Sequence, residues 1–247
     1  MSTMLVPKIH CVGEVSSTMD VVREMLTTSP TDVPPFAVLA ESQTSGRGTT
    51  ARQWLSPPGN MYLTLCLPLG AVREELLSVL PLLIGLACRA AVMELVKGAT
   101  IHVKWPNDVI YAAQKIGGSI VESVGTNLII GIGMNVEVAP PVPDGGRPSY
   151  AINSLAASLG QEPITPKSLA EVVCRNVCSS ATGKELTRAA LVEQFEAVMD
   201  KSLELHRRTT VGREPIPLYA VRLNEWGHLV VRHPSGAEEV LVAEYLF

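Results

Sequence analysis

The chain has 247 residues, of which 47% are hydrophobic and 18% are charged, so it can bury a sizeable core in one large domain or in one domain with a small module. Its formal net charge of −4 lacks the basic excess of a nucleic-acid-binding protein, and we expect no nucleic-acid partner. The five cysteines are scattered, without a histidine pattern for zinc, which predicts reduced and mostly buried thiols.

Export and membrane signals are weak. The first residues lack a charged segment followed by an apolar one, so we expect no secretory signal. The most apolar stretch, residues 76–95, is interrupted by Pro81, Arg89 and Glu94, and its uncharged part is too short to cross a bilayer. We therefore predict a buried core helix there, a cytoplasmic location and no membrane partner.

Strand and helix signals alternate along most of the chain. Apolar runs predict strands at 8–15, 36–40, 61–67, 101–104, 109–111, 115–124 and 127–138. Apolar residues at helical spacing predict helices at 19–26, 73–97, 166–180 and 187–205, the second in one or two pieces with a bend near Pro81. This order predicts an α/β (α+β) fold, with a mixed sheet flanked by helices.

The pattern changes after His206, where short strands predominate. Strands are predicted at 216–223, 229–233 and 239–245, with turn signals at Gly227 and Gly236 between them. We therefore predict two domains: residues 1–206 as the main α/β domain, and residues 207–247 as a small barrel-like β-module.

A polar loop, Glu41–Trp54, connects two of the predicted strands and cannot pack a core. Gly46 and Gly48 allow a close backbone approach, and Arg47 and Arg52 supply planar forks of donors, a combination that can bind an anion. The loop has neither the Walker pattern nor the dinucleotide-binding glycine pattern. Taken alone, it is more often typical of a solvated hairpin connection than of a binding site.

Three further motifs follow the loop: Lys104–Asp108 (KWPND), Lys115–Gly118 (KIGG) and Gly131–Asn135 (GIGMN). With the loop and in this order, they resemble the biotin protein ligases, or holocarboxylase synthetases, over residues 12–136. The resemblance implies the class II synthetase-like catalytic fold of that family, followed by an SH3-like C-terminal module. Because the first predicted strand leaves no room before it for a helix-turn-helix domain, we expect the monofunctional type, which lacks a DNA-binding domain.

The resemblance implies a two-step reaction with ATP and Mg²⁺. The biotin carboxylate attacks the α-phosphate of ATP to give biotinyl-5′-AMP and pyrophosphate, and a lysine of a carrier domain then attacks the acyl carbonyl and releases AMP. The first step brings two anions together and needs cations, whereas the second needs a deprotonated amine. The implied partners are the biotin carboxyl carrier domains of biotin-dependent carboxylases, and the implied assembly is a monomer or weak homodimer.

Carried over position by position, the resemblance also implies roles for the motif residues. Lys115 bridges the biotin carboxylate and the α-phosphate, Arg47 holds the acyl-phosphate region, and Asp108 orients or deprotonates the acceptor lysine. The implied biotin contacts are Ser17, Thr18, Gln43, Gly46, Arg47, Gly48, Lys115 and Gly118. The implied ATP contacts are Arg52, Trp54, Lys104, Asn107 and Asn135, with Mg²⁺ near Asn107 and Asp108.

Ordinary structural roles are open for several of these residues. Ser17 and Thr18 could cap a helix, and Trp54 and Trp105 could pack in the core. Lys104 and Asp108 could form a surface ion pair, and Asn135 could cap a turn.

Three positions depart from the family pattern. Met19 stands where the family has a third biotin-binding polar residue, and Thr49 and Ala51 replace an arginine and a glycine. The loop therefore has one cation fewer to close over the adenylate, which predicts weaker retention of that intermediate.

Two other functions stay open. A lipoate or octanoate ligase or transferase shares the fold and the lysine, although the KWPND motif and the loop favour biotin. A non-catalytic biotin- or nucleotide-binding protein is supported only by the altered loop.

Overall fold

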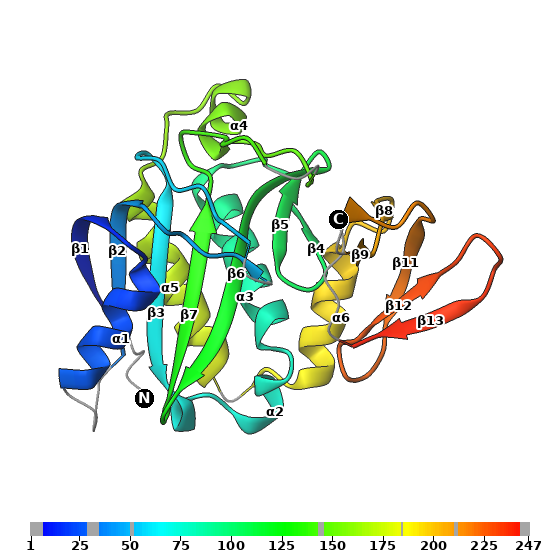
Figure 1. Cartoon of the computed structure of the whole chain (residues 1–247), viewed down its shortest axis with the longest axis horizontal. Coiled ribbons are helices and arrows are strands. Elements are labelled where there is room, and N and C mark those ends of the chain that lie inside the picture. Colours follow the sequence, from blue (N-terminus) through cyan, green and yellow to red (C-terminus); the bar gives the residue numbers. More distant parts are fainter. Residues whose placement is uncertain are drawn as a thin grey trace.

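The computed structural model describes residues 7–28, 35–49, 52–142, 146–183, 185–209 and 212–242. Figure 1 shows how the helices and strands are arranged. In chain order they are β1 (Lys8–Val15), α1 (Thr18–Thr28), β2 (Phe36–Gln43), β3 (Met61–Pro68), the 3-10 helix η2 (Leu69–Ala71), α2 (Glu74–Leu77), α3 (Leu80–Leu95), β4 (His102–Lys104), β5 (Asp108–Tyr111), β6 (Gln114–Val124), β7 (Asn127–Met134), α4 (Ile152–Ser158), α5 (Pro166–Thr182), α6 (Arg188–Val198), β8 (Glu204–Leu205), β9 (Arg208–Thr209), β10 (Gly212–Arg213), β11 (Leu218–Leu223), β12 (Leu229–Arg232) and β13 (Glu238–Leu241).

Seven strands form one mixed sheet in the order β1-β2-β3-β7-β6-β5-β4. β1 runs parallel to β2, and the other neighbouring strands are antiparallel. β3 and β7 lie in the middle of the sheet, where Met61 is opposite Met134, and β4 and β5 form a hairpin at one edge (Figure 1). The predicted mixed sheet flanked by helices is confirmed.

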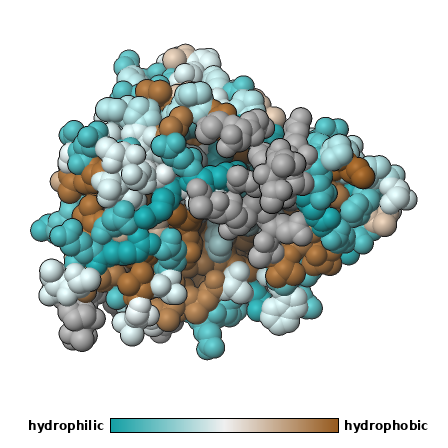
Figure 2. All heavy atoms as spheres, viewed as in Figure 1, coloured by the Kyte–Doolittle hydropathy of each residue, from teal (hydrophilic) through white to brown (hydrophobic). Residues whose placement is uncertain are grey.

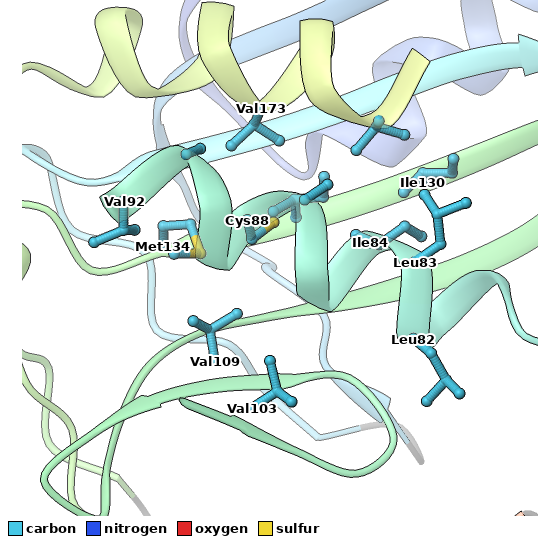
Figure 3. Packing of buried hydrophobic residues seen from close by; sticks show 14 of the residues in the cluster. Leu82, Leu83, Ile84, Cys88, Val92, Val103, Val109, Ile130, Met134 and Val173 are labelled. Atoms are coloured by element: carbon cyan, nitrogen blue, oxygen red, sulfur yellow. The ribbon is translucent and has the colours of Figure 1, made fainter. Parts of the chain in front are cut away.

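Helices cover both faces of the sheet because successive side chains of a strand point to opposite faces. In β2, Phe36 and Val38 pack in a small core with α1, whereas Ala37 and Leu39 belong to the larger core on the opposite face. Figure 3 shows the apolar side chains of α3 gathered in this larger core with Val173 of α5 and with residues of the strands. The sheet is therefore held on both sides.

The segment predicted as a helix at 73–97 forms two helices, α2 and α3. The break falls at Ser78 and Val79, and Pro81 lies in the first turn of α3. Proline is tolerated there because the first N–H groups of a helix have no intrahelical acceptor, so the second helix begins near Pro81 and does not bend at it. Within the described part of the chain, no helix is long and apolar enough to span a bilayer.

Two predicted elements end earlier than their patterns indicate. β7 ends at Met134 because the side-chain oxygen of Asn60 accepts hydrogen bonds from the amides that follow. α6 ends at Val198, not at residue 205, because Met199 pairs instead with Val103 of β4. In both cases tertiary hydrogen bonds override the local periodicity.

A second sheet of four antiparallel strands follows, in the order β13-β12-β11-β8. The predicted small C-terminal sheet is thus confirmed. Leu218 of β11 lies opposite Leu205 of β8, so the small sheet includes a strand that precedes residue 207; the domain boundary itself stays a prediction. The strand predicted at 239–245 ends as β13 at Leu241, and residues 243–247 lie outside the described residues.

The cysteines are free thiols, and four of the five are buried, whereas Cys11 is exposed. Burial raises the pKa of Cys66 to about 11 and that of Cys88 to about 12. Such thiols stay protonated and unreactive at neutral pH. The predicted mostly buried cysteines are therefore confirmed.

Candidate active site

A cleft lies over the middle of the sheet. β6 and β7 contribute its floor, and the start of α1 and the loop after β2 contribute its walls. On the face seen in Figure 2, a band of hydrophilic residues extends from the lower left toward the centre of the molecule. Of the residues to which the resemblance gives a role, those that line the cleft are Ser17, Thr18, Gln43, Arg47, Gly48, Trp54, Asn107, Lys115 and Gly118, and the departing residues Met19 and Thr49 line it as well. The others, which do not belong to this lining, are Gly46, Arg52, Lys104, Asp108 and Asn135.

Glycines let the loop and the floor approach each other closely. A Cβ atom on Gly133 of β7 would lie 2.7 Å from the Trp54 ring. A Cβ atom on Gly46 would collide with the Trp54 carbonyl oxygen and would lie 2.5 Å from Ser56 Oγ. Gly46 therefore shapes the loop outside the cleft lining, and Gly133 leaves room for the Trp54 ring against β7.

Hydroxyl and amide groups converge at the α1 end of the cleft. Ser17 Oγ accepts a hydrogen bond from the Met19 amide at 3.3 Å, so it caps α1. The Gln43 side-chain oxygen accepts from the Thr18 amide at 2.9 Å and from the Thr18 hydroxyl at 3.2 Å, and Thr64 Oγ1 donates to Thr18 Oγ1 at 2.7 Å. These bonds fix the polar groups in place along β2, β3 and α1.

A buried carboxylate joins two lysines further along the cleft. Lys115 Nζ lies 2.6 Å from Asp108 Oδ1, and Lys104 Nζ lies 3.6 Å from Asp108 Oδ2. Burial alone would raise the pKa of Asp108, but the ammonium groups of Lys115 and Lys104 outweigh it and hold the pKa below its ordinary value. Because Lys104 is only 5% exposed, this is a buried cluster and not a surface ion pair.

The pKa of Lys104 is lowered strongly within this cluster. Burial is the main reason that its pKa falls from 10.5 to about 8, and the charges of Lys115 and Arg147 lower it further, against the opposing effect of Asp108. Near neutral pH, Lys104 is therefore a charged group close to its titration range.

Arg47 is paired with Asp20, an acidic residue whose role the sequence patterns did not reveal. Arg47 Nη2 lies 2.6 Å from Asp20 Oδ1, and Arg23 shares this carboxylate at 2.9 Å and also pairs with Glu122 of β6. The side chains are about a third or more exposed, so each pair contributes less than about 1 kcal/mol. Asp20 lies in the first turn of α1, where an acidic residue ordinarily complements the helix dipole.

The loop folds back on itself beyond Arg47. The Gly48 amide donates to the Arg52 carbonyl at 2.7 Å, and Arg52 Nη2 donates to Thr49 Oγ1 at 2.9 Å. The charge of Arg52 also lowers the pKa of Asp108, so Arg52 lies near the lysine cluster. Ala51, the second departure of the loop from the family pattern, lies outside the described residues.

Trp54 lies against the Lys115 ammonium group, and two asparagines donate hydrogen bonds to β6, the strand that carries Lys115. Lys115 Nζ lies 5.1 Å from the centre of the Trp54 ring, a cation–π distance. The Asn107 side chain donates to the Ser119 carbonyl of β6. Asn135 Nδ2 donates to the Lys115 carbonyl at 3.2 Å, so Asn135 supports the strand that carries Lys115.

Arg147 is a further cation that the sequence patterns missed. Its guanidinium donates to the Ala113 carbonyl at 3.2 Å and to the Glu204 carbonyl at 3.4 Å, and its charge lowers the pKa of Lys104. It lies in the Pro- and Gly-rich stretch 139–148, which has no periodicity to indicate a buried contact.

The cleft therefore joins two different environments. At one end, fixed amide and hydroxyl groups lie beside apolar side chains. At the other end, the carboxylate of Asp108 interacts electrostatically with four cations, Lys104, Lys115, Arg52 and Arg147. This excess of positive charge suits an anion bound next to a mostly apolar group. Fold and site together define an α/β protein with a cleft over its mixed sheet that is suited to an anionic ligand with an apolar part.

Comparison with known proteins agrees with this class. Residues 12–138 match the Biotin/lipoate A/B protein ligase family. A biotin--[acetyl-CoA-carboxylase] ligase of Paracoccus denitrificans is 36% identical over 115 residues, which are 42% of this chain and 45% of that protein. The match thus spans less than half the length of that curated relative.

Solved structures match over nearly the whole chain. Biotin protein ligase from Leishmania major is similar in its complex with biotin (47% identity, TM-score 0.78) and in its complex with biotinyl-5-AMP (46% identity, TM-score 0.75), and each comparison covers 96% of this chain and 99% of that one. Biotin protein ligase from Aquifex aeolicus in complex with biotin and ATP is 25% identical, with a TM-score of 0.75 and coverage of 97% of both chains. The chain belongs to the Biotin/lipoate A/B protein ligase family.

Proposed function

We propose that this protein is an ATP-dependent ligase that activates biotin as biotinyl-5′-AMP and transfers the biotinyl group to a lysine of a biotin carboxyl carrier domain. The observation that carries the proposal is the place of Lys115, which stands in the cleft between the fixed amide and hydroxyl groups and the cations around Asp108. The Leishmania major and Aquifex aeolicus relatives were solved with biotin, with biotinyl-5-AMP and with ATP, which supports the same ligands here.

In the first step, Lys115 would neutralise the biotin carboxylate and the α-phosphate as they approach each other. A lysine ammonium is a compact point charge that can serve both anions at once. Arg47 and the Gly48 amide would hold the acyl-phosphate region, while Thr18 and Gln43 would hold the ureido ring. Because these donors are fixed before the ligand arrives, little reorganisation is needed in the transition state.

Mg²⁺ would enter with ATP. Both oxygens of Asp108 face lysines, and among the described residues no cluster of three metal-binding side chains occurs. A phosphate-borne Mg²⁺ needs few protein ligands, and Asn107, whose amide group is oriented by the Ser119 carbonyl, is suited to be one of them. The metal would supply charge neutralisation on the phosphates.

In the second step, the acceptor lysine of the carrier would attack the acyl carbonyl. Asp108 is ionised at neutral pH because its pKa is lowered, so its carboxylate can orient an incoming amine and accept a hydrogen bond from it. The carrier-domain partner, the monomeric or weakly dimeric assembly and the cytoplasmic location stay predictions.

A lipoate or octanoate ligase is the alternative within the family. Isothermal titration with biotin and with lipoate separates the two. We expect biotin to bind with an affinity at least about tenfold higher, because Thr18 and Gln43 match a ureido ring and lipoate has none. Tighter binding of lipoate would favour the alternative.

The pH dependence of ATP use should report Lys104. We expect kcat/KM for ATP to fall as the pH rises through about 8, because the neutral amine no longer attracts phosphate. Lys104→Arg keeps its charge across this range and should remove the alkaline limb. An identical limb in that variant would assign the titration to another group.

The same shift fixes the sign of the stability change. Between about pH 8 and 10.5, the unfolded chain holds a proton that the folded chain has released, so the free energy of unfolding should rise with pH over this window. Denaturant unfolding of the wild type and of Lys104→Arg across the window measures it.

The departure at Thr49 should weaken retention of the adenylate. Its hydroxyl accepts from Arg52 but supplies no cation, and a charge-assisted hydrogen bond contributes roughly 1.5–3 kcal/mol. Thr49→Arg should therefore slow dissociation of biotinyl-5′-AMP by about tenfold or more. Single-turnover trapping of released adenylate measures the rate, and an unchanged rate would show that position 49 does not gate the site.

A further inference from the structure

The turn between β11 and β12 docks on the hairpin that carries the KWPND motif. Trp105 Nε1 donates a hydrogen bond to the Gly227 carbonyl at 3.0 Å, although the two residues lie 122 positions apart. Trp105 is 4% exposed, and a buried indole N–H needs an acceptor. Figure 1 shows β11 and β12 beyond α6, at the β4 edge of the main sheet. The C-terminal module thus supplies the acceptor for a motif residue of the main domain.

The docking is close enough to require glycine. Gly227 has a φ of +80°, and a Cβ atom there would lie 2.7 Å from Val79 Cγ1 and 3.0 Å from Leu82 Cδ1. A second hydrogen bond ties the end of β11 to α6, since the Leu223 amide donates to Glu196 Oε2 at 2.8 Å. The turn is therefore seated against the start of α3 and against α6.

The hairpin beneath this turn holds two charges of the site. Lys104 precedes Trp105 directly, and Lys104 lies opposite Asp108 in the β4–β5 register. β4 has three residues and is the outermost named strand of its sheet, with one isolated bridge from Val103 to Met199 on its outer side. So short a strand gains little stability from its own ladder. The placement of Lys104 and Asp108 therefore depends on the groups that pack on the hairpin.

We propose that the C-terminal module positions the phosphate end of the cleft, and that Trp105 is the positioning residue through which the Gly227 turn fixes the Lys104–Asp108 pair. The inference rests on the proposed function. Trp105 is not in the cleft lining and acts through its neighbours in the hairpin. Thr18 and Gln43, at the biotin end, are held by α1 and β2 instead, so loss of the contact should weaken the use of ATP and spare the binding of biotin.

Two variants remove the contact from its two sides. Trp105→Phe keeps an aromatic ring and removes the donor, and Gly227→Ala forces the turn away from Val79 and Leu82. We expect each to raise KM for ATP in biotin-dependent pyrophosphate exchange, by about tenfold for Trp105→Phe, the effect of losing one buried hydrogen bond, and by more for Gly227→Ala. The Kd of biotin, measured by titration without ATP, should change by less than about twofold.

A matched control lies in the same turn. Trp226 is 48% exposed, and its ring stacks under Arg188, with the guanidinium carbon 4.1 Å from the ring centre. Trp226→Ala changes the turn without touching Trp105 and should leave KM for ATP unchanged. Because both test variants break the same hydrogen bond, the KM for ATP of the double variant should be no higher than that of Gly227→Ala alone.

A general loss of folded protein would lower kcat and the number of biotin sites together and would leave KM for ATP as it was. Folded Trp105→Phe protein with the wild-type KM for ATP would overturn the proposal, and this variant decides the matter if Gly227→Ala does not fold. Exchange by the wild type is measured first. If the wild type gives no biotin-dependent exchange, the proposed function itself is contradicted. If the wild type is active and the variants have the wild-type KM for ATP, only the positioning by the module is contradicted.

Discussion

Replacing Lys115 with alanine should lower biotin-dependent ATP–pyrophosphate exchange by about 10²–10³-fold, the loss that follows removal of one preorganised donor to a developing charge. Lys115 Nζ is held 2.6 Å from Asp108 and over the Trp54 ring, so its position is set before any ligand binds. The side chain is 23% exposed at the cleft, and we expect the free energy of unfolding to change little.

Two companion variants sharpen this test. Lys97→Ala removes an exposed lysine just after α3 and should leave exchange unchanged. Lys115→Arg keeps the charge but replaces a compact ammonium with a planar fork, so it should recover only part of the rate. Exchange near the wild-type rate in Lys115→Ala would remove Lys115 from the chemistry.

Asp108→Asn should separate the two half-reactions. The change keeps the size of the side chain and removes the charge that would orient the acceptor amine, so transfer of biotin to a carrier lysine should fall by about 10²-fold or more. Pyrophosphate exchange should largely survive when it is measured at saturating ATP and below neutral pH, where Lys104 keeps its charge. Because Lys104 then loses its buried counter-charge, the free energy of unfolding should also fall, by about 1–3 kcal/mol. Single-turnover transfer from preformed adenylate measures the second half-reaction alone.

An equal loss in both half-reactions would contradict this assignment. It would move Asp108 from the acceptor amine to the ATP side of the cleft, where its role would be to hold Lys104 and Lys115. Ser123→Ala, at an exposed position of the same strand β6 and outside the cleft lining, is a control for disturbance of the strand and should affect neither half-reaction by more than about twofold.

The apolar runs predicted most of the sheet because that signal is local, whereas the cleft residues were implied by the resemblance to the biotin protein ligases. Lys104, Asp108 and Lys115 lie together because β4 pairs with β5 and β5 pairs with β6. The ends of elements were harder to predict. α6 ends at Val198 because Met199 finds a partner on β4, and no local pattern contains that contact.

The missed residues share the same physical reason. Asp20 resembles any acidic residue in a first helical turn, and its partner Arg47 belongs to a loop 27 positions away. Arg147 lies in a stretch without periodicity, and the acceptor of the Trp105 indole lies in the C-terminal module. Such contacts depend on how distant segments meet, which propensity and spacing do not encode.

Exchange of labelled pyrophosphate into ATP tests the central claim most directly, because it needs only the first half-reaction and no carrier protein. The wild-type protein should incorporate label when biotin is present and not when biotin is omitted or replaced with lipoate. Folded protein that binds biotin but gives no exchange, or exchange that is the same without biotin, would contradict the claim that the cleft activates biotin as its adenylate.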